Sequence, residues 1–373
     1  MDSRIKAWTV CRQTRTSKSL LSLCLVPMLV LAGCSKQTVQ QTSKPLKPGD
    51  YAAILPYQTS DTRAKHIGLI SDIDIRTQLE QGLMDISKDY FDPDTHAYVN
   101  HKYLDYDELD ASDGSRGLLG TLRDDNPNGL NPGADEDFDT GNGIVKGQIL
   151  VADLYELDFF SGNALDGIAI GLAVTDAVEQ DGVRYEITPE RLRDFVQASG
   201  TKIVSYMRER FNDVTPNIPI LVAAYELNTD ENDSSKGGYV YAEFFDGTRT
   251  TDKAISEEYL LVPSTAFSQA QPEMAAQFET FRADVAQILS DTTYTTGEAK
   301  IQDGSVQKLT LTITAHGKTV GEILAVIQSV REYLSIFESE NCAYKVIIKN
   351  NGDICALMDR EPDSKSVQVL TTY

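Results

Sequence analysis

The fold is indicated first by residues 167–174, which read Gly-Ile-Ala-Ile-Gly-Leu-Ala-Val and predict a strand. An amphipathic helix is expected next, over residues 188–211, with Thr188 as its cap and Pro189 in its first turn. Two further strands are expected at residues 218–227 and 238–245, joined by a polar loop. This part of the chain therefore predicts the order strand, helix, strand, strand.

The same order of elements returns later in the chain. Residues 306–315 predict a strand, and residues 319–337 predict a helix that begins with a capping box of Thr319 and Glu322. Strand-like runs on both sides of Asn351-Gly352 predict a tight hairpin. The sequence therefore predicts an α+β fold with two similar lobes, each a mostly antiparallel sheet with packed helices.

The expected boundaries follow from these elements. The first lobe spans residues 151–265 and the second spans residues 266–373, with another amphipathic helix at 274–289. Residues 51–150 form an N-terminal helix and loop region. It contains one helix with an apolar stripe, followed by a long stretch rich in Asp, Asn, Gly and Pro that predicts loop; the stripe is Ile75, Leu79, Leu83, Ile86 and Tyr90.

The net charge of the chain narrows the classes of partner that the protein is expected to bind. The chain has 373 residues and a formal net charge of −22, with 41% hydrophobic residues. This hydrophobic content is ordinary for a folded protein. A strongly negative surface repels phosphate backbones, and the sequence contains no basic patch, so nucleic acid is not an expected partner.

Residues 1–33 differ from the remainder and predict a lipoprotein signal peptide. They carry a net charge of +4, whereas the remaining residues carry −26. The apolar run at 20–32 has 13 residues, too few for a permanent membrane helix but typical of a signal peptide core. Leu31-Ala-Gly-Cys34 resembles a bacterial lipobox, in which the signal is cut between Gly33 and Cys34.

The lipobox predicts a diacylglyceryl group and an acyl chain on Cys34. Two or more acyl chains anchor a protein stably where a single chain is marginal. Residues 34–50 are polar and predict a flexible tether. We therefore expect a protein held by lipid at the extracellular face of the cell membrane.

The two cysteines of the predicted lobes, Cys342 and Cys355, are expected to be buried free thiols. The Asn351-Gly352 hairpin would pair Cys355 with Ile348, which leaves Cys342 roughly 20 Å away along the ribbon. That separation is well beyond the reach of a disulfide.

Several segments together resemble the CamS sex pheromone lipoproteins of Gram-positive bacteria. The resemblance rests on the lipobox and on the runs at 51–56, 83–84, 91–94, 129–132, 167–173 and 258–264, which occur in the family's order. It implies a membrane-anchored extracellular lipoprotein. It also implies that the segment Val26–Gly33 could be released as a peptide pheromone, although Pro27 and Gly33 differ from the Ala-, Ile- and Phe-rich peptide of the family.

Motifs for catalysis or metal binding are sparse. The four histidines form no His-Glu-x-x-His pair, and His96 and His101 are expected to be solvated in the loop. One loop follows the start of a calcium-binding pattern, with Asp124, Asn126 and Asn128 as alternate oxygen ligands and Asp135 as the last ligand. Calcium is therefore one candidate cofactor.

The sequence is compatible with three hypotheses about function. The body could be a surface module that binds a peptide, a small molecule or an envelope protein between the two lobes, with residues 158–163 and 228–237 as candidate rims. Alternatively, the signal segment is the product and the body is a carrier. The third alternative is an envelope enzyme whose catalytic residues form no recognised motif.

Overall fold

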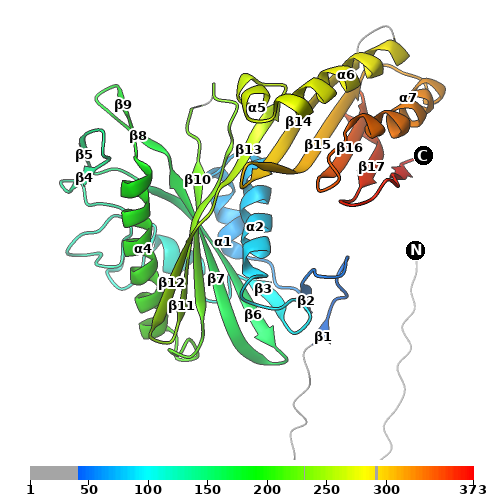
Figure 1. The fold of residues 1–373 in the computed structure, drawn as a ribbon. Helices are drawn as coiled ribbons and strands as arrows, with labels where there is room; N and C mark the ends of the chain where they lie inside the picture. The colour runs from blue at the N-terminus through cyan, green and yellow to red at the C-terminus, as the bar shows by residue number, and fades with distance from the viewer. Residues whose placement is uncertain (1–40, 231, 290–292) are drawn as a thin grey trace, which may run out of the picture. The chain divides into compact units, whose positions relative to one another are not determined.

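The computed structural model describes residues 41–230, 232–289 and 293–373, which lie in one compact unit. The predicted signal peptide and Cys34 lie outside the described residues. Two large sheets organise this unit, one of eight strands and one of six (Figure 1). Within the described part of the chain, none of the helices combines the length and apolar character that crossing a bilayer requires.

The eight-stranded sheet has the order β1-β2-β3-β6-β7-β10-β11-β12. Most neighbours are antiparallel, but β2 pairs with β3, and β7 with β10, in parallel. Its strands are β1 (Gln41–Thr42), β2 (Ala52–Leu55), β3 (Ala97–Asn100), β6 (Val151–Ser161), β7 (Ala164–Thr175), β10 (Ile220–Leu227), β11 (Gly237–Asp246) and β12 (Arg249–Ala254).

Helices cover both faces of this sheet, with α4 on one side and α2 on the other (Figure 1). Shorter elements and two small hairpins complete this half of the unit. The helices are α1 (Asp61–Lys65), η1 (His66–Gly68), α2 (Ile73–Ser87), α3 (Tyr106–Asp110) and α4 (Pro189–Arg210); the hairpins are β4 (Asp137–Asp139) with β5 (Ile144–Lys146) and β8 (Ala177–Gln180) with β9 (Val183–Glu186).

The packing of strand β7 explains the alternation of small and large side chains at residues 167–174. Its large side chains, such as Ile168 and Ile170, face the core under α4. The alternate positions are Gly or Ala, because the opposite face is approached closely: a Cβ on Gly167 would lie 2.0 Å from the ring of Phe91. At Gly171 the nearest neighbours would be the hydroxyl of Tyr239 and a methyl of Leu83 on α2. The small residues therefore allow α2 to pack against the sheet.

The six-stranded sheet has the order β13-β14-β15-β16-β17-β18, and only β15 and β16 are parallel. Helices α6 and α7 cover one of its faces. The elements are β13 (Glu257–Val262), α5 (Thr265–Ala270), α6 (Pro272–Ile288), β14 (Thr293–Gln302), β15 (Ser305–Ala315), α7 (Val320–Tyr333), η2 (Leu334–Ile336), β16 (Ala343–Asn350), β17 (Asp353–Arg360) and β18 (Gln368–Thr371).

The predicted repeat is present in the topology. In each sheet an antiparallel pair leads into a helix, which returns the chain to a parallel neighbour, and that neighbour forms an antiparallel pair with the next strand. The two series are β6-β7-α4-β10-β11 and β14-β15-α7-β16-β17. The predicted α+β class is therefore confirmed, as are the Thr188 cap and the Thr319–Glu322 capping box.

The hairpin at Asn351-Gly352 is also confirmed, but its predicted register is wrong beyond the turn. A bulge after Ile348 pairs this residue with Ala356 rather than with Cys355. Both Cys342 and Cys355 are free, as predicted, but only Cys342 is fully buried. Cys355 is half-buried because the bulge places it outside the regular alternation of the strand.

Candidate functional site

Helix α2 forms one wall of the candidate site. The side chain of Asp72 accepts a hydrogen bond from the amide of Asp74 and caps the helix. Leu79 and Leu83 bury one face against the eight-stranded sheet. The hydroxyl of Tyr239 on β11 donates a 2.7 Å hydrogen bond to the carbonyl of Leu79. These contacts hold the helix against the sheet, and Thr77, Gln81 and Asp85 lie on its exposed side.

The floor comes from the uncovered face of the six-stranded sheet. Along β15, Leu309 and Leu311 point into the core under α6 and α7. Side chains alternate across a strand, so Lys308, Thr310 and Thr312 lie on the other face. Neighbouring strands place further polar residues opposite them. In β14, Lys300 pairs with Lys308, Glu298 with Thr310 and Thr296 with Thr312.

Between this wall and this floor lies a groove of about 420 Å³, which we call the α2 groove. Its volume is within the range of small-ligand sites. It is lined by Asp74, Thr77, Gln78, Gln81 and Asp85 from α2, by Tyr259 and Leu261 from β13, and by Thr296, Gly297, Glu298, Lys300, Lys308, Thr310, Thr312, Ile347 and Lys349 from β14, β15 and β16.

Direct contacts join the wall to the floor. The side-chain amide of Gln78 donates a 2.8 Å hydrogen bond to Glu298. The ammonium of Lys300 lies 2.9 Å from the carboxylate of Glu257 and 3.9 Å from that of Asp85. Since the side chains of Lys300 and Glu257 are only 14% and 3% exposed, this ion pair is shielded from water.

A second cavity, of about 390 Å³, continues the α2 groove at the Asp85 end. The two share Asp85, Lys300 and Lys308. Its remaining lining comes mainly from the turn between β14 and β15 and from the end of β12, and includes Lys253 and Asp303. The groove therefore extends beyond the span of α2.

Electrostatics distinguish Lys308 from its neighbours. Burial lowers the pKa of Lys308, and the positive charges of Lys345 and Lys300 lower it further. On the same floor, burial raises the pKa of Glu298, although its hydrogen bond from Gln78 opposes this. Among the described residues, no carboxylate lies within ion-pair distance of Lys308. The carboxylates of Glu298 and Asp85 oppose this lowering from a greater distance, so Lys308 is a half-buried cation without a direct ion-pair partner among the described residues.

A separate polar cluster lies in the eight-stranded sheet, around Asp153 on β6. The guanidinium of Arg63 binds both oxygens of this carboxylate, at 2.7 and 2.8 Å. His66 uses one ring nitrogen for Asp153, at 3.0 Å, and the other for Asp110. Burial alone would lower the pKa of His66, but these two carboxylates outweigh it and raise the pKa.

This arrangement is unsuited to general base catalysis. A catalytic histidine needs one free nitrogen to take a proton, and both nitrogens of His66 are occupied by carboxylates. Asp153 is fully buried, and Arg63 neutralises it. The cluster therefore fastens α1 and η1 to the sheet as a structural ion network.

A second buried group on β6 fastens the chain after β3. Glu156 accepts hydrogen bonds from the amides of Tyr103 and Leu104, and Asp158 accepts one from the amide of Lys102. Burial raises the pKa of Asp158 to about 6 and raises that of Glu156 well above its ordinary value. The neighbouring His101 is buried rather than solvated, and burial lowers its pKa to about 3.

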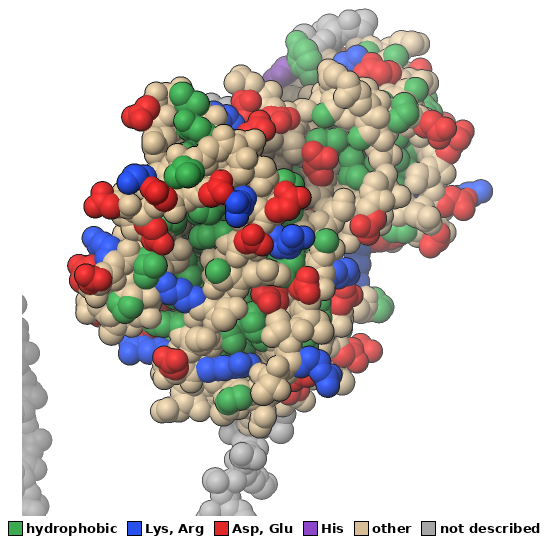
Figure 2. Space-filling model, turned by 60° about the vertical axis from the view of Figure 1, so that its left-hand side comes forward, with side chains coloured by type: hydrophobic (Ala, Val, Ile, Leu, Met, Phe, Trp, Pro, Cys, Tyr) green, Lys and Arg blue, Asp and Glu red, His purple; other side chains and the backbone are tan. Residues whose placement is uncertain are grey.

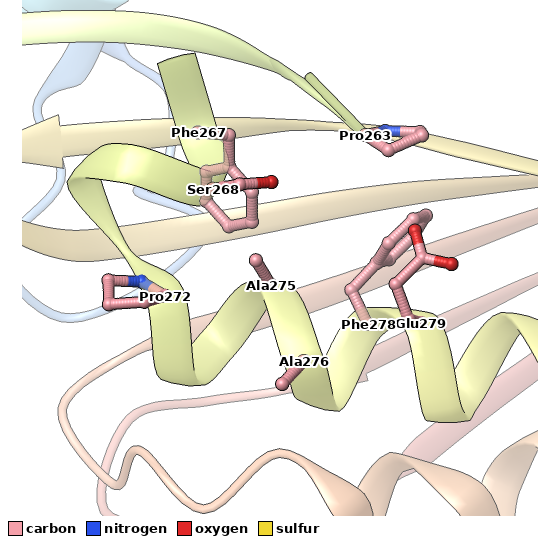
Figure 3. Close-up of a pocket in the computed structure, with 8 residues that line it drawn as sticks. All are labelled: Pro263, Phe267, Ser268, Pro272, Ala275, Ala276, Phe278 and Glu279. Carbon is pink, nitrogen blue, oxygen red and sulfur yellow. The ribbon is translucent and has the colours of Figure 1, made fainter. Parts of the chain in front are cut away.

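Two other surfaces are poorer candidates. A notch of about 270 Å³ between α5 and α6 is lined mainly by Pro, Phe and Ala side chains, with Ser268 and Glu279 as its only polar side chains (Figure 3). On the face drawn in Figure 2, acidic and basic side chains are interspersed without one gathered patch. Neither surface offers the convergent polar groups of the α2 groove.

The structure places the predicted calcium ligands in an ordered loop. Asn126 is buried, and its amide donates to the carbonyl of Gly117, whereas Asp124 and Asp135 are exposed and Asn128 is partly exposed. The described residues contain no group of three or more His, Cys, Asp or Glu side chains placed to hold a metal ion. Calcium binding by this loop stays a prediction that calorimetric titration can check.

The two predicted rim loops do not line the α2 groove. Asp158 to Ser161 continue strand β6, so this segment is not a loop. The segment at 228–237 lies closer: Lys236 donates its amide to Tyr259 on β13 and forms an ion pair with Asp72 at the start of α2. The predicted lipidation and cleavage residues, Gly33 and Cys34, lie outside the described residues.

Comparisons with known proteins agree with the fold. A family model described as CamS sex pheromone cAM373 precursor matches residues 57–366. A crystal structure of a sex pheromone precursor from Lactobacillus salivarius is similar with a TM-score of 0.76 and 22% identity, over 90% of this chain and 99% of that one. The structure of the C-terminal domain of the sex pheromone staph-cAM373 precursor from Staphylococcus aureus is similar with a TM-score of 0.65 and 21% identity, over 80% of this chain and 96% of that one.

No curated protein matches the chain. The two structural likenesses, at 22% and 21% identity, concern the fold. The family model spans most of the chain, begins after the predicted signal peptide and includes most strands of both sheets. The chain therefore belongs to the CamS sex pheromone cAM373 precursor family.

Proposed function

We propose that the protein is an extracellular lipoprotein, anchored to the cell membrane through Cys34, whose body binds a ligand in the α2 groove. The sequence of residues 1–34 supports the anchoring, because a basic start, a short apolar run and a lipobox occur in that order. The groove supports the binding role, because its lining joins polar side chains from one helix and four strands around an open volume of about 420 Å³.

The surroundings of the groove are suited to binding a ligand. The polar groups of the groove sit on α2 and on the strands, and the Gln78–Glu298 and Lys300–Glu257 contacts hold them in place. Binding is stronger when the site is already formed, because less conformational entropy is lost. The histidine cluster of the other sheet is engaged in structural contacts and offers no free base.

Metabolic labelling with a radioactive fatty acid tests the anchor. The wild-type chain should take up label and remain with the membrane fraction, whereas Cys34→Ala should do neither. Cys24→Ala is the matched control, because Cys24 lies in the predicted signal core and should not matter. Equal labelling of wild type and Cys34→Ala would contradict the anchoring.

A thermal-shift panel tests the groove. The full chain in detergent is mixed separately with pentapeptides, neutral disaccharides and glycerol phosphate, and the same panel is applied to Thr312→Trp, which fills the floor. One class should raise the Tm of the wild type but not that of the filled variant. If no class does so, or if both proteins respond equally, ligand binding in the groove is refuted.

A second proposed function follows from the family description. The segment Val26–Gly33 would be the pheromone and the body its carrier. The family match begins at residue 57 and does not cover this segment, so besides the family description the proposal rests on the sequence of the segment itself. A synthetic Pro27–Gly33 peptide should induce conjugation or clumping in a recipient strain, and failure in all recipients would refute it.

A further inference from the structure

We propose that the α2 groove binds an extended peptide that places a carboxylate over Lys308; this inference rests on the proposed ligand-binding function. The carboxylate can belong to an acidic side chain or to the C-terminus of the peptide. Four features of the groove lead to this choice: its length, the neutral polar groups of its middle, a Lys308 without an ion-pair partner among the described residues, and the scarcity of aromatic side chains in its lining.

The shape of the groove suits an extended chain. On the floor, Lys308 lies near one end and Lys349 near the other. Lys349 pairs with Thr314, six residues along β15, which corresponds to roughly 20 Å. The wall from Asp74 to Asp85 covers about 16 Å of helix. An extended peptide of about five residues spans the same length.

The middle of the groove can satisfy a peptide backbone. Each residue of a bound peptide brings one amide donor and one carbonyl acceptor, and both need partners when water is excluded. Thr310 and Thr312 offer hydroxyls that donate or accept, and Thr77 and Gln81 offer similar groups from the wall. Ile347 provides an apolar contact between them. Neutral polar groups with both capacities match an amide backbone.

Lys308 supplies the preference for negative charge. Lys300 faces it across the strand pair, but Glu257 and Asp85 already neutralise Lys300. Lys345 adds a further positive charge nearby. Glu298 and Asp85 offset part of this repulsion, but neither forms an ion pair with Lys308, so a ligand carboxylate directly over the ammonium relieves the remainder. The charges of the lining balance, with three lysines against Asp74, Asp85 and Glu298, so Lys308 is distinguished by lacking an ion-pair partner among the described residues and not by an excess of cations.

Other occupants fit less well. Sugar-binding sites commonly stack sugar rings on exposed aromatic side chains, and Tyr259 is the only aromatic residue in the groove lining. The chain's own segment Val26–Gly33 is also a poor match. Its sequence is Val-Pro-Met-Leu-Val-Leu-Ala-Gly, without a charged side chain, and the groove offers mostly polar surface.

Calorimetric titration of the full chain in detergent tests the proposal. The probes are three pentapeptides: Thr-Glu-Thr-Glu-Thr blocked at both ends, Thr-Gln-Thr-Gln-Thr with a free carboxyl terminus, and blocked Thr-Lys-Thr-Lys-Thr. The first or the second should bind at least about tenfold more tightly than the third. The comparison between the first and the second identifies which carboxylate is used.

Variants locate the binding. Lys308→Gln should lower the affinity for the acidic peptide about tenfold. Lys308→Arg should retain most of the affinity because the positive charge remains. Lys146→Gln, on the exposed hairpin β4–β5, is the control and should bind as the wild type does. A thermal melt of each variant excludes unfolding as the cause of lost binding. A higher salt concentration should weaken the binding of the acidic peptide to the wild type, because salt screens the contact between opposite charges.

The outcomes separate this inference from the proposed function. If the basic peptide binds as well as the acidic one, or if Lys308→Gln binds like the wild type, the carboxylate preference is wrong. If disaccharides or glycerol phosphate stabilise the wild type but not Thr312→Trp, and no peptide binds, the groove is a binding site but not for peptides. If nothing binds, both proposals fail.

Discussion

Gln78 on α2 and Glu298 on β14 are joined by a 2.8 Å hydrogen bond, although they are far apart in the chain. The side-chain oxygen of Gln78, Oε1, accepts a 2.7 Å hydrogen bond from the hydroxyl of Tyr225 on β10. One amide thus links helix α2 with both large sheets. The α2 groove depends on this link, because Gln78 and Glu298 line it.

Gln78→Ala should therefore destabilise the protein. The substitution leaves the buried hydroxyl of Tyr225 without its acceptor and Glu298 without its donor, which should lower the free energy of unfolding by about 2 kcal/mol or more. Urea unfolding measures this change. Gln81→Ala is the matched control on the exposed side of the same helix and should change the value by less than about 0.5 kcal/mol. Equal effects of the two substitutions would contradict the role of Gln78.

Gly82→Ala should also destabilise, although alanine is the better helix former. A Cβ at this position would lie 2.5 Å from the ring of Tyr239, which is fully buried and bonded to the carbonyl of Leu79. A Cβ at Gly321 on α7 would have no neighbouring atom within 4 Å. Gly321→Ala should therefore raise the free energy of unfolding by up to about 1 kcal/mol. The two substitutions should shift the Tm in opposite directions. A higher Tm for Gly82→Ala would show that α2 is not packed as described.

The buried pair Glu156 and Asp158 should make the protein less stable as the pH rises. The pKa of Asp158 is raised from 3.8 to about 6 by burial, so the folded state holds a proton that the unfolded state has lost. The raised pKa of Asp158 contributes fully to the free energy of unfolding below about pH 4, and this contribution is lost between about pH 4 and pH 6. Its size is about 3 kcal/mol for a fully buried group.

Asp158→Asn tests this dependence, because an amide can still accept the hydrogen bond from Lys102 without a charge. Relative to the wild type, the variant should gain stability as the pH is raised from 4 to 7. Asp194→Asn, at an exposed position on α4, should show no such trend. A difference between Asp158→Asn and wild type that does not change with pH would refute the buried-charge explanation.

His66 and His101 should titrate at opposite ends of the histidine range. Two carboxylates raise the pKa of His66, so its imidazolium should persist above pH 6.5. Burial lowers the pKa of His101 to about 3, so this ring should stay neutral as long as the protein is folded. Imidazole carbon chemical shifts followed by NMR distinguish the two states. The reverse order of titration would mean that the two environments are misassigned.

Local patterns were sufficient to predict most helices and the repeat. Helix α2 followed from its apolar stripe, and α4 and α7 followed from their stripes and caps. Strand β6 was missed because Asp153, Glu156 and Asp158 give it the composition of a surface loop. Their charges are accommodated by Arg63, His66 and the amides of residues 102–104, which are distant in sequence.

The α2 groove could not be predicted for a similar reason. Its wall comes from residues 74–85 and the rest of its lining from strands that begin at residue 257 or later, and no spacing within either segment signals their meeting. The alternation of Lys and Thr with apolar residues in β15 does show that one face of the strand is polar. Which polar face meets which helix is decided by tertiary packing alone.

The most direct test of ligand binding in the α2 groove is a side-chain NMR titration of the full chain in detergent with the acidic pentapeptide. The methyl signals of Ile347, Thr310 and Thr312 should shift in proportion to bound peptide, while the exposed Ile144 on β5 should not move. Unchanged groove signals under saturating peptide, or shifts that appear only outside the groove, would contradict binding at this site.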